Sequence, residues 1–302
     1  MERVRIKNRV RKSLRFSIFD GIAASITNGI VDNYIRPMAL AFNATDIQIG
    51  VLSSVPHLLS SLAQLKAPEL TELVGSRKGL IQRAVFFHAL ALAAIASLPL
   101  LLDGHGLLSV ATDGHGMMML TLLYCLCMVF GSLGHPAWGS MMAELVPRRR
   151  LGIYFGRRER IMGLVAVSSC FMAGLFLHWQ TSQILMAFSV VFFAAALSRL
   201  ASFYYMGKMY EPPMKEGREH YFSFVDFLKR MPRGNFGRYI FFLGAMNLAV
   251  NISAPFFSVF MLRELGFSYI TFTLLTTIGA LAQLLAKPFW GRYADRVGNL
   301  RV

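Results

Sequence analysis

The sequence predicts an all-α polytopic membrane protein, a bundle of eight membrane-spanning helices. Three observations indicate this fold class. The 302 residues are 55% hydrophobic and only 16% charged, with a mean hydropathy of +0.50, which is too apolar for an ordinary soluble domain. The apolar residues gather in runs of about 20, the length that crosses a bilayer. The basic residues alternate between connections, so that 29 of the 31 fall on one side.

Eight apolar runs define the predicted spans: 16–40, 47–66, 80–102, 117–141, 161–180, 184–206, 238–262 and 269–290. One connection, at 207–237, is long, and it carries Phe224, Phe227, Leu228 and Met231 at helical spacing. That spacing predicts an amphipathic helix on the membrane surface. The chain therefore divides into a six-helix half at 1–206, a linker at 207–237 and a two-helix start of a second half at 238–302.

The net charge of +15 lies almost wholly in connections on one side of the predicted bundle. Seven basic residues precede the first span, and eight belong to the long sixth connection and its edges, from Arg199 to Arg238. Only Arg36 and Arg263 fall on the other side. The positive-inside rule then puts the N-terminus and the linker in the cytoplasm, with basic clusters against anionic lipid. We expect an integral protein of the plasma (inner) membrane whose partner is the bilayer and not a nucleic acid.

The first span carries polar residues along one face, because Asp20, Asn28 and Asp32 are separated by multiples of four. An ionisable group inside a span costs about 2.5–3.5 kcal/mol on insertion scales, so this face should line protein or water. Asn28, near mid-span, and Asp32 are candidates for a cavity, whereas Asp20 lies near the cytoplasmic end and suits a gate. A polar seam between packed helices is the alternative that the sequence leaves open.

Three further polar residues lie inside predicted spans. His135 follows Gly134 and precedes Pro136, a setting typical of close packing or of a bend that faces a cavity. Asn247 and Asn251 are one turn apart in the seventh span. The two Asp-Gly-His-Gly elements at 103–106 and 113–116 indicate a turn-rich loop more than a metal site. The three cysteines lie in apolar spans as packing residues, so the sequence predicts no metal site and no cofactor.

The last span leads into a loop that reads G-x-x-x-D-R-x-G-x-x-R, formed by Gly291, Asp295, Arg296, Gly298 and Arg301. The glycines suit close helix approach and a tight reversal, Asp295 supplies an anion for a helix N-terminus, and the arginines suit the headgroup layer. An ungapped offset of 223 residues pairs Asn28 with Asn251 and aligns this loop with a weaker copy after the second span. That copy contains Pro68, Glu72, Gly75 and Lys78, beside Arg77.

The repeated loop resembles the signature of the major facilitator superfamily of secondary transporters, where it lies between helices 2 and 3 and again between helices 8 and 9. The resemblance implies two parallel six-helix halves around a central substrate site. It implies a substrate path formed by Asn28, Asp32, His135, Asn247 and Asn251. It implies a cytoplasmic gating motif formed by Asp20, Glu72, Gly75, Arg77, Lys78, Gly291, Asp295, Arg296, Gly298 and Arg301. Eight of twelve expected helices are present, so we interpret the chain as a truncated gene or a fragment.

The predicted function is secondary transport of a small solute by alternating access, coupled to a proton or sodium gradient. In the superfamily the second signature faces the start of helix 5, so Asp295 should lie within about 6 Å of that helix start or of the arginines at 157–160 in an outward-open state. Glu72 would instead need a partner from helices beyond the eighth. Two alternatives stay open: a non-transporting assembly or sensor protein, and a membrane-embedded enzyme. No H-E-x-x-H, G-x-S-x-G or phosphate-binding glycine loop supports an enzyme.

Overall fold

The computed structural model describes residues 2–104, 115–213 and 234–297, and the regular structure of these residues is entirely helical. Their α-helices are α1 (Glu2–Ala41), α2 (Asp46–Leu65), α3 (Ala67–Val74), α4 (Arg77–Gly104), α6 (His115–Leu133), α7 (His135–Leu145), α8 (Leu151–Trp179), α9 (Ile184–Gly207), α11 (Asn235–Val259) and α12 (Tyr269–Val297). Short helical turns lie at Arg148–Arg150, Thr181–Gln183 and Phe260–Glu264.

Among the described residues, six helical segments are long and apolar enough to cross a membrane, as in an integral membrane protein. They are Arg77–Leu101, Gly116–Leu145, Leu151–Trp179, Ile184–Gly207, Gly237–Glu264 and Tyr269–Ala286. The first two predicted spans, now α1 and α2, are helical but fall outside this set. Polar side chains such as Asp20, Asn28 and Asp32 lower the hydropathy of α1, so composition alone does not mark it as a span.

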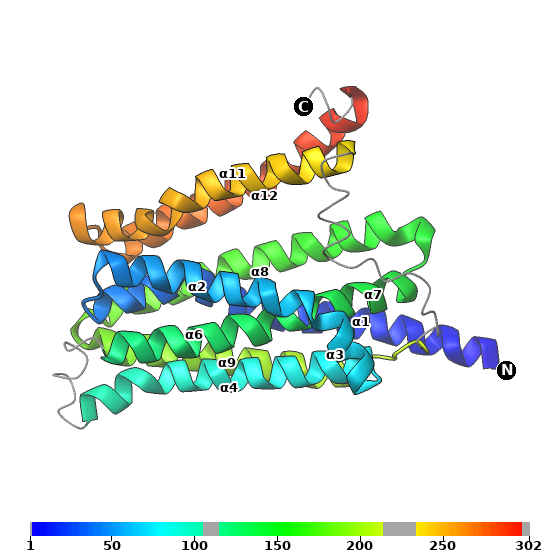
Figure 1. The fold of residues 1–302 in the computed structure, drawn as a ribbon, viewed down its shortest axis with the longest axis horizontal. Helices are drawn as coiled ribbons and strands as arrows, with labels where there is room; N and C mark the ends of the chain where they lie inside the picture. Colours follow the sequence, from blue (N-terminus) through cyan, green and yellow to red (C-terminus); the bar gives the residue numbers. More distant parts are fainter. Residues whose placement is uncertain (1, 105–114, 214–233, 298–302) are drawn as a thin grey trace.

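The helices from α1 to α9 pack side by side as a bundle, which we call the bundle of α1–α9 (Figure 1). Within it α1 packs against α8 and α9, α4 packs against α9 and α6, and α2 packs against α6. One end of the bundle holds the start of α1, the α7–α8 connection and the end of α9, and we call it the basic end. The opposite end holds the α1–α2 and α8–α9 connections.

Two apolar clusters fill the bundle. The larger cluster joins α1, α2, α4, α6, α8 and α9, and Tyr34, Leu92 and Phe188 at its centre are fully buried. The smaller one, near the basic end, joins α4, α7 and α9 through Leu80, Met141 and other residues. Lipid is as apolar as a leucine side chain, so helix association in a membrane depends on close contact more than on burial from water. Gly29 provides such contact at the α1–α8 crossing, because a Cβ atom there would lie 2.3 Å from the carbonyl oxygen of Ala166.

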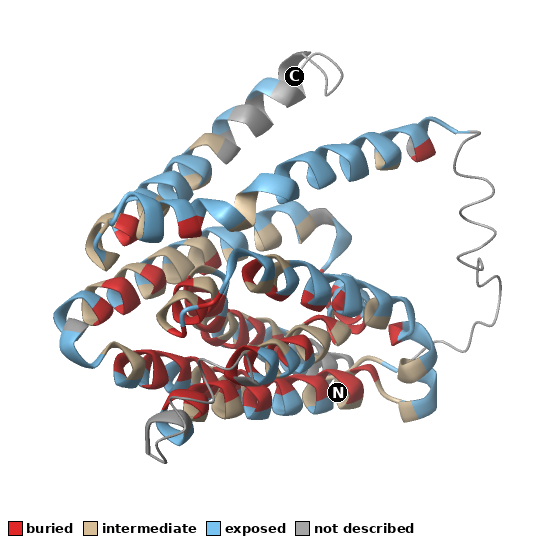
Figure 2. Cartoon of the chain, turned by 60° about the vertical axis from the view of Figure 1, so that its left-hand side comes forward, coloured by how far each residue is buried: buried red, intermediate tan, exposed pale blue. Residues whose placement is uncertain are grey.

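The second part of the described chain is a hairpin of α11 and α12 that lies along one side of the bundle (Figure 1). Its α12 packs against α8, and its α11 touches α1 and α2. After the first turn of α11, the buried residues of this helix are Ser258 and Val259, near the opposite end. Toward the basic end α11 diverges from the bundle, and its surface is exposed almost all round (Figure 2).

The fourth predicted span, 117–141, is two helices in the structure. Gly134 separates α6 from α7, and Pro136 lies in the first turn of α7. Proline is tolerated there because the first N–H groups of a helix have no partner within it, but proline disrupts the interior of a continuous helix. The expected bend is therefore present beside His135. The predicted amphipathic helix at 207–237 and the loop at 103–116 fall mostly outside the residues that the structure describes.

Candidate solute cavity and the polar network beside it

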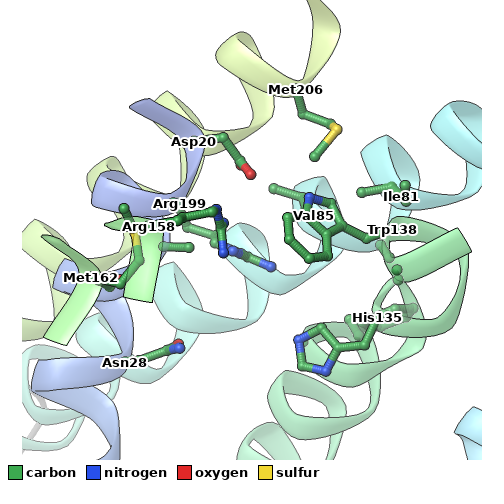
Figure 3. Close-up of a pocket in the computed structure, with 18 of the residues that line it drawn as sticks. Asp20, Asn28, Ile81, Val85, His135, Trp138, Arg158, Met162, Arg199 and Met206 are labelled. Atoms are coloured by element: carbon green, nitrogen blue, oxygen red, sulfur yellow. The ribbon is translucent and has the colours of Figure 1, made fainter. Parts of the chain in front are cut away.

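A cavity of about 520 Å³ lies inside the bundle and is lined by α1, α4, α6, α7, α8 and α9 (Figure 3). This volume is within the range typical of small-molecule sites. In α4, α8 and α9 its lining residues come from the half of the helix nearer the basic end, such as Val85, Arg158 and Met206, whereas in α1 they come from the middle of the helix. Gly131 of α6, Gly134 between the two helices and Gly139 of α7 also line the cavity, and a Cβ atom at Gly139 would meet nothing within 4 Å.

Three residues that the sequence singled out line this cavity: Asp20, Asn28 and His135. Asn28 points into it from α1, and His135 approaches from α7 across the space (Figure 3). Asn28 and Asp32 also line a smaller cavity of about 130 Å³, together with Thr276 and Thr277 of α12. One face of α1 therefore lines both cavities, as its polar spacing predicts.

Asn247 and Asn251 line neither cavity. Both are exposed on α11, and each donates its side-chain amide to the backbone of its own helix, at 2.8 Å from the carbonyl oxygens of Leu243 and Asn247 respectively. In this arrangement of the hairpin, Asn251 thus does not reach a cavity that Asn28 lines. The placement of these two residues in a substrate path stays a prediction.

Arg199 of α9 is the most buried cation of the large cavity, with 8% of its surface exposed. Its Nη1 donates to Ser202 Oγ at 3.4 Å, and Ser202 Oγ donates to Asp20 Oδ1 at 2.6 Å. Among the described residues Arg199 makes no ion pair within 4.0 Å, and its Nε has no hydrogen-bond partner. Burying a guanidinium whose Nε has no hydrogen-bond partner costs free energy, and a further anion or acceptor would offset that cost.

Arg158 of α8 points toward the same space as Arg199 (Figure 3). Its Cζ lies 4.4 Å from the centroid of the Trp138 ring, a cation–π contact. Gly21 of α1 makes room for this side chain, because a Cβ atom at that position would lie 2.6 Å from Arg158 Nη2. Arg158 Nε donates to the carbonyl oxygen of Ser17 at 3.5 Å, so the indole, the glycine and this hydrogen bond together hold the guanidinium at the wall of the cavity.

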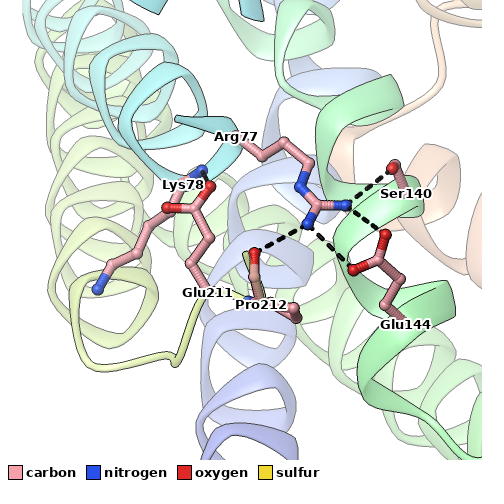
Figure 4. A network of polar contacts seen from close by, with 6 residues as sticks. All are labelled: Arg77, Lys78, Ser140, Glu144, Glu211 and Pro212. Carbon is pink, nitrogen blue, oxygen red and sulfur yellow. Dashed lines mark hydrogen bonds and ion pairs between the residues drawn. The ribbon is translucent and has the colours of Figure 1, made fainter. Parts of the chain in front are cut away.

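The predicted gating residues of the first loop lie at the basic end, between α3 and α4. Gly75 ends α3 with a φ of +66°, in the left-handed region that favours glycine. Arg77 is buried and donates two hydrogen bonds to Glu144 of α7, at 3.0 and 3.1 Å (Figure 4). It also donates to Ser140 Oγ at 3.1 Å and to the carbonyl of Pro212 at 3.0 Å. Arg77 thus fastens α4 to α7 and to the chain after α9.

Lys78 and Glu211 extend this network. Lys78 Nζ donates to the carbonyls of Gly207 and Met209 at 2.6 and 2.9 Å, at the end of α9. The Glu211 carboxylate accepts from Ser76 Oγ at 2.7 Å and from the Lys78 backbone N–H at 3.2 Å. It thereby stands at the N-terminus of α4, where the helix dipole favours an anion. These contacts all lie within residues 76–212, so they connect parts of the bundle to one another at the basic end.

The structure describes the remaining predicted gating residues only in part. Glu72 is exposed on α3. The backbone of Gly291, Asp295 and Arg296 belongs to α12, but their side chains, like Gly298 and Arg301 as a whole, lie outside what the structure describes. The predicted contact between Asp295 and the start of helix 5 therefore stays a prediction.

Sequence reasoning did not identify Arg199, Arg158 or Trp138 as site residues. A signal was present for Arg199, because it lies inside the predicted span 184–206, where an ionisable side chain indicates a functional position. Counting it with the basic edge of the next connection concealed that signal.

Comparisons of this chain with protein-family models, with curated proteins and with solved structures found no match.

Proposed function

We propose that the protein is a secondary transporter of the major facilitator type, which moves a small solute by alternating access and couples it to a proton or sodium gradient. The observation that carries the proposal is the polar and charged cavity of about 520 Å³ inside a bundle of helices long enough to span a membrane. In this proposal all eight long helices cross the plasma (inner) membrane, and the basic end faces the cytoplasm.

The dimensions of α1 and α2 support the eight-span arrangement. At 1.5 Å per residue, the 20 residues of α2 extend about 30 Å, the thickness of the hydrocarbon core. The 40 residues of α1 exceed that length, and its middle lies inside the bundle against α8 and α9. Its polar residues face cavities instead of lipid, which is how an ionisable side chain is tolerated in a span.

The position of the hairpin suggests which access state is present. Contacts near the opposite end hold it to the bundle: Tyr34 Oη lies 2.8 Å from Thr273 Oγ1, and Arg263 Nη1 lies 2.7 Å from Asp46 Oδ1. Toward the basic end α11 diverges, on the side to which the cavity is nearer. We assign this arrangement to a cytoplasm-open state. Approach of the hairpin to α8 at the basic end would then produce the outward-open state in which the Asp295 latch is expected.

Uptake into proteoliposomes tests this function. Vesicles containing the purified chain are given a mixture of organic acids, amines, sugars and amino acids under an imposed proton or sodium gradient, and the contents are measured by mass spectrometry. We expect accumulation of one solute class that depends on the gradient. The variant Asn28→Leu should lose this accumulation at unchanged protein content, whereas Ser168→Leu, an exposed site near the middle of α8, should retain it. Folded protein that accumulates no solute under either gradient would contradict the proposal.

A further inference from the structure

The interior of the large cavity holds more positive than negative charge. Its charged lining residues are Asp20, Arg158, Glu159 and Arg199. The side chain of Glu159 is 72% exposed, so water screens it, and its nearest oxygen is 4.0 Å from Arg158 Nη1. Within the protein interior that leaves two guanidinium groups against one carboxylate, and Ser202 already donates a 2.6 Å hydrogen bond to that carboxylate.

Arg199 is the buried guanidinium of the cavity that no carboxylate among the described residues contacts directly, within 4.0 Å. Ser202 lies between it and Asp20, the contact of Arg199 with that hydroxyl is long at 3.4 Å, and Nε is unpartnered among the described residues. Arginine cannot lose its proton at any physiological pH, so it cannot become neutral to avoid the cost of burial. A ligand that brings an acceptor oxygen and negative charge would remove that cost, and a planar guanidinium matches a carboxylate or phosphate with two parallel hydrogen bonds.

The rest of the lining favours a ligand with an apolar body. Val85, Phe130 and Met162 contribute apolar surface, and the Trp138 ring stacks on Arg158 within the same cavity. A volume of about 520 Å³ exceeds what a bare inorganic anion fills. His135 approaches from α7, opposite Asn28, and can donate or accept a hydrogen bond at the other side of the space (Figure 3).

We infer that the cavity binds a small organic anion, a carboxylate or phosphate ester with an aliphatic or aromatic body, with Arg199 as its principal charge partner and Arg158 as the second. This inference rests on the proposed transport function and names its substrate class. Trp138 and Gly21 act as positioning residues: they hold Arg158 so that its donors face the ligand.

The test measures binding to the full chain in lipid nanodiscs by isothermal titration calorimetry. The anionic probes are phenylacetate, hexanoate and phenyl phosphate. Phenethylamine and 2-phenylethanol match phenylacetate in size but carry a positive charge or none. We expect at least one anion to bind at least about tenfold more tightly than the amine and the alcohol, since a hydrogen bond to a charged group is worth about that factor or more.

Variants assign the binding to the two arginines. Arg199→Gln should weaken anion binding at least about tenfold. Arg199→Lys keeps the positive charge but lacks the planar guanidinium that donates two parallel hydrogen bonds, so it should retain part of the anion binding. Arg158→Gln should weaken binding less, because its guanidinium is partly occupied by the indole. The matched control is Arg157→Gln, an exposed neighbour outside the cavity, which should bind as the unmodified protein does. Binding of phenylacetate should also change the fluorescence of Trp138, a change that Trp138→Phe abolishes.

Three results would overturn the inference: no binding of any of the three anions, equal binding of phenethylamine, or unchanged anion binding in both Arg199→Gln and Arg158→Gln. If Arg199→Gln does not fold, the anion binding of Arg199→Lys and of Arg158→Gln decides whether the arginines form the site. Failure of the inference is distinguishable from failure of the proposed function. Anion binding by a chain that accumulates no solute in vesicles contradicts transport alone, and gradient-driven accumulation of an amine contradicts the anion site alone.

Discussion

The bundle of α1–α9 and the hairpin of α11 and α12 are both rich in helices that can cross a membrane, yet they are packed very differently. More than half of the most apolar 18-residue stretch of α4 is buried in the protein, whereas none of the corresponding stretch of α11 is. Hydropathy thus identifies a helix that can cross a membrane but not what covers it, because lipid and a protein interior are equally apolar. Packing is determined instead by small residues and a few polar contacts.

Those contacts also differ between the two regions. Inside the bundle, the Arg77 network joins α4, α7 and the chain after α9 through four donated hydrogen bonds at the basic end. The hairpin is held at the opposite end, by the junction of Tyr34, Gly174 and Thr273 and by the Arg263–Asp46 pair. A change in one region should therefore leave the other region's contacts intact, and the following variants test that separation.

The largest effect is expected from Gly174→Ala in α8. A Cβ atom there would lie 1.8 Å from Thr273 Oγ1 and 2.3 Å from Tyr34 Oη, so α12 must move away and the Tyr34–Thr273 hydrogen bond must break. We expect a loss of about 2–3 kcal/mol in the free energy of unfolding, measured by detergent titration in mixed micelles. The thiol of Ser258→Cys, buried where α11 meets the bundle, should react faster with maleimide in this background.

The matched control is Gly156→Ala in the same helix, where an added Cβ meets nothing within 4 Å. Because alanine favours the helix over glycine, this variant should be as stable as the unmodified protein or more stable, by up to about 1 kcal/mol. Equal destabilisation by Gly174→Ala and Gly156→Ala would show that α8 does not tolerate alanine at either position. Close contact with α12 would then not be the cause of the stability loss in Gly174→Ala.

A smaller effect is expected from Glu144→Gln, which weakens the Arg77 network of the bundle. It removes the anion that binds Arg77, a residue with only 5% of its surface exposed. Since the Glu144 side chain is itself 37% exposed and water can replace part of its role, we expect a loss of about 1.5 kcal/mol in the same unfolding titration. The reactivity of Ser258→Cys should not change. Faster labelling of that thiol would show that the two regions are coupled.

The control for Glu144→Gln is Glu69→Gln. Glu69 pairs with Lys66 at 3.0 Å on the exposed surface of α3, so its loss should cost less than about 0.5 kcal/mol. A cost equal to that of Glu144→Gln would remove the distinction between a buried network and an exposed pair.

The smallest effect is expected from Arg263→Gln in the hairpin. Arg263 pairs with Asp46 and also donates to the carbonyl of Ala44, but both side chains of the pair are more than a third exposed. We expect a coupling energy below about 1 kcal/mol in a double-mutant cycle with Asp46→Asn, measured by the unfolding titration. A coupling well above that value would make this pair, and not the Gly174 junction, the principal attachment of the hairpin.

Sequence pattern predicted the helices and part of the cavity for physical reasons that are easy to identify. Helical spacing put Asp20 and Asn28 on one face of α1. Because a polar face inside a membrane must meet protein or water, this spacing also indicated that the face would line an interior cavity, as both residues do. Gly134 and Pro136 marked the break between α6 and α7, because proline cannot continue a helix.

Other features depended on information that a single sequence does not contain. Three arginines stand at 157, 158 and 160, and only the middle one lines the cavity. Which of them turns inward depends on the rotation of α8 against α1, and in the fold Arg158 and Met162 are the residues that approach Gly21. Asn251 matches Asn28 in the internal alignment, yet it lies on an exposed surface because the hairpin touches the bundle elsewhere. Equivalent sequence positions need not have equivalent neighbours.

Labelling of Gly139→Cys tests most directly whether the cavity is a solute site reached from one side of the membrane. Gly139 lines the cavity, and a Cβ atom there meets nothing within 4 Å. Arg148→Cys at the basic end and Gln180→Cys at the opposite end report which side an impermeant thiol reagent reaches, while the three native cysteines are buried. We predict that Gly139→Cys is labelled from the side that labels Arg148→Cys, and that phenylacetate slows the reaction. Labelling from the side of Gln180→Cys only, or equal labelling from both sides that no organic anion slows, would contradict the account.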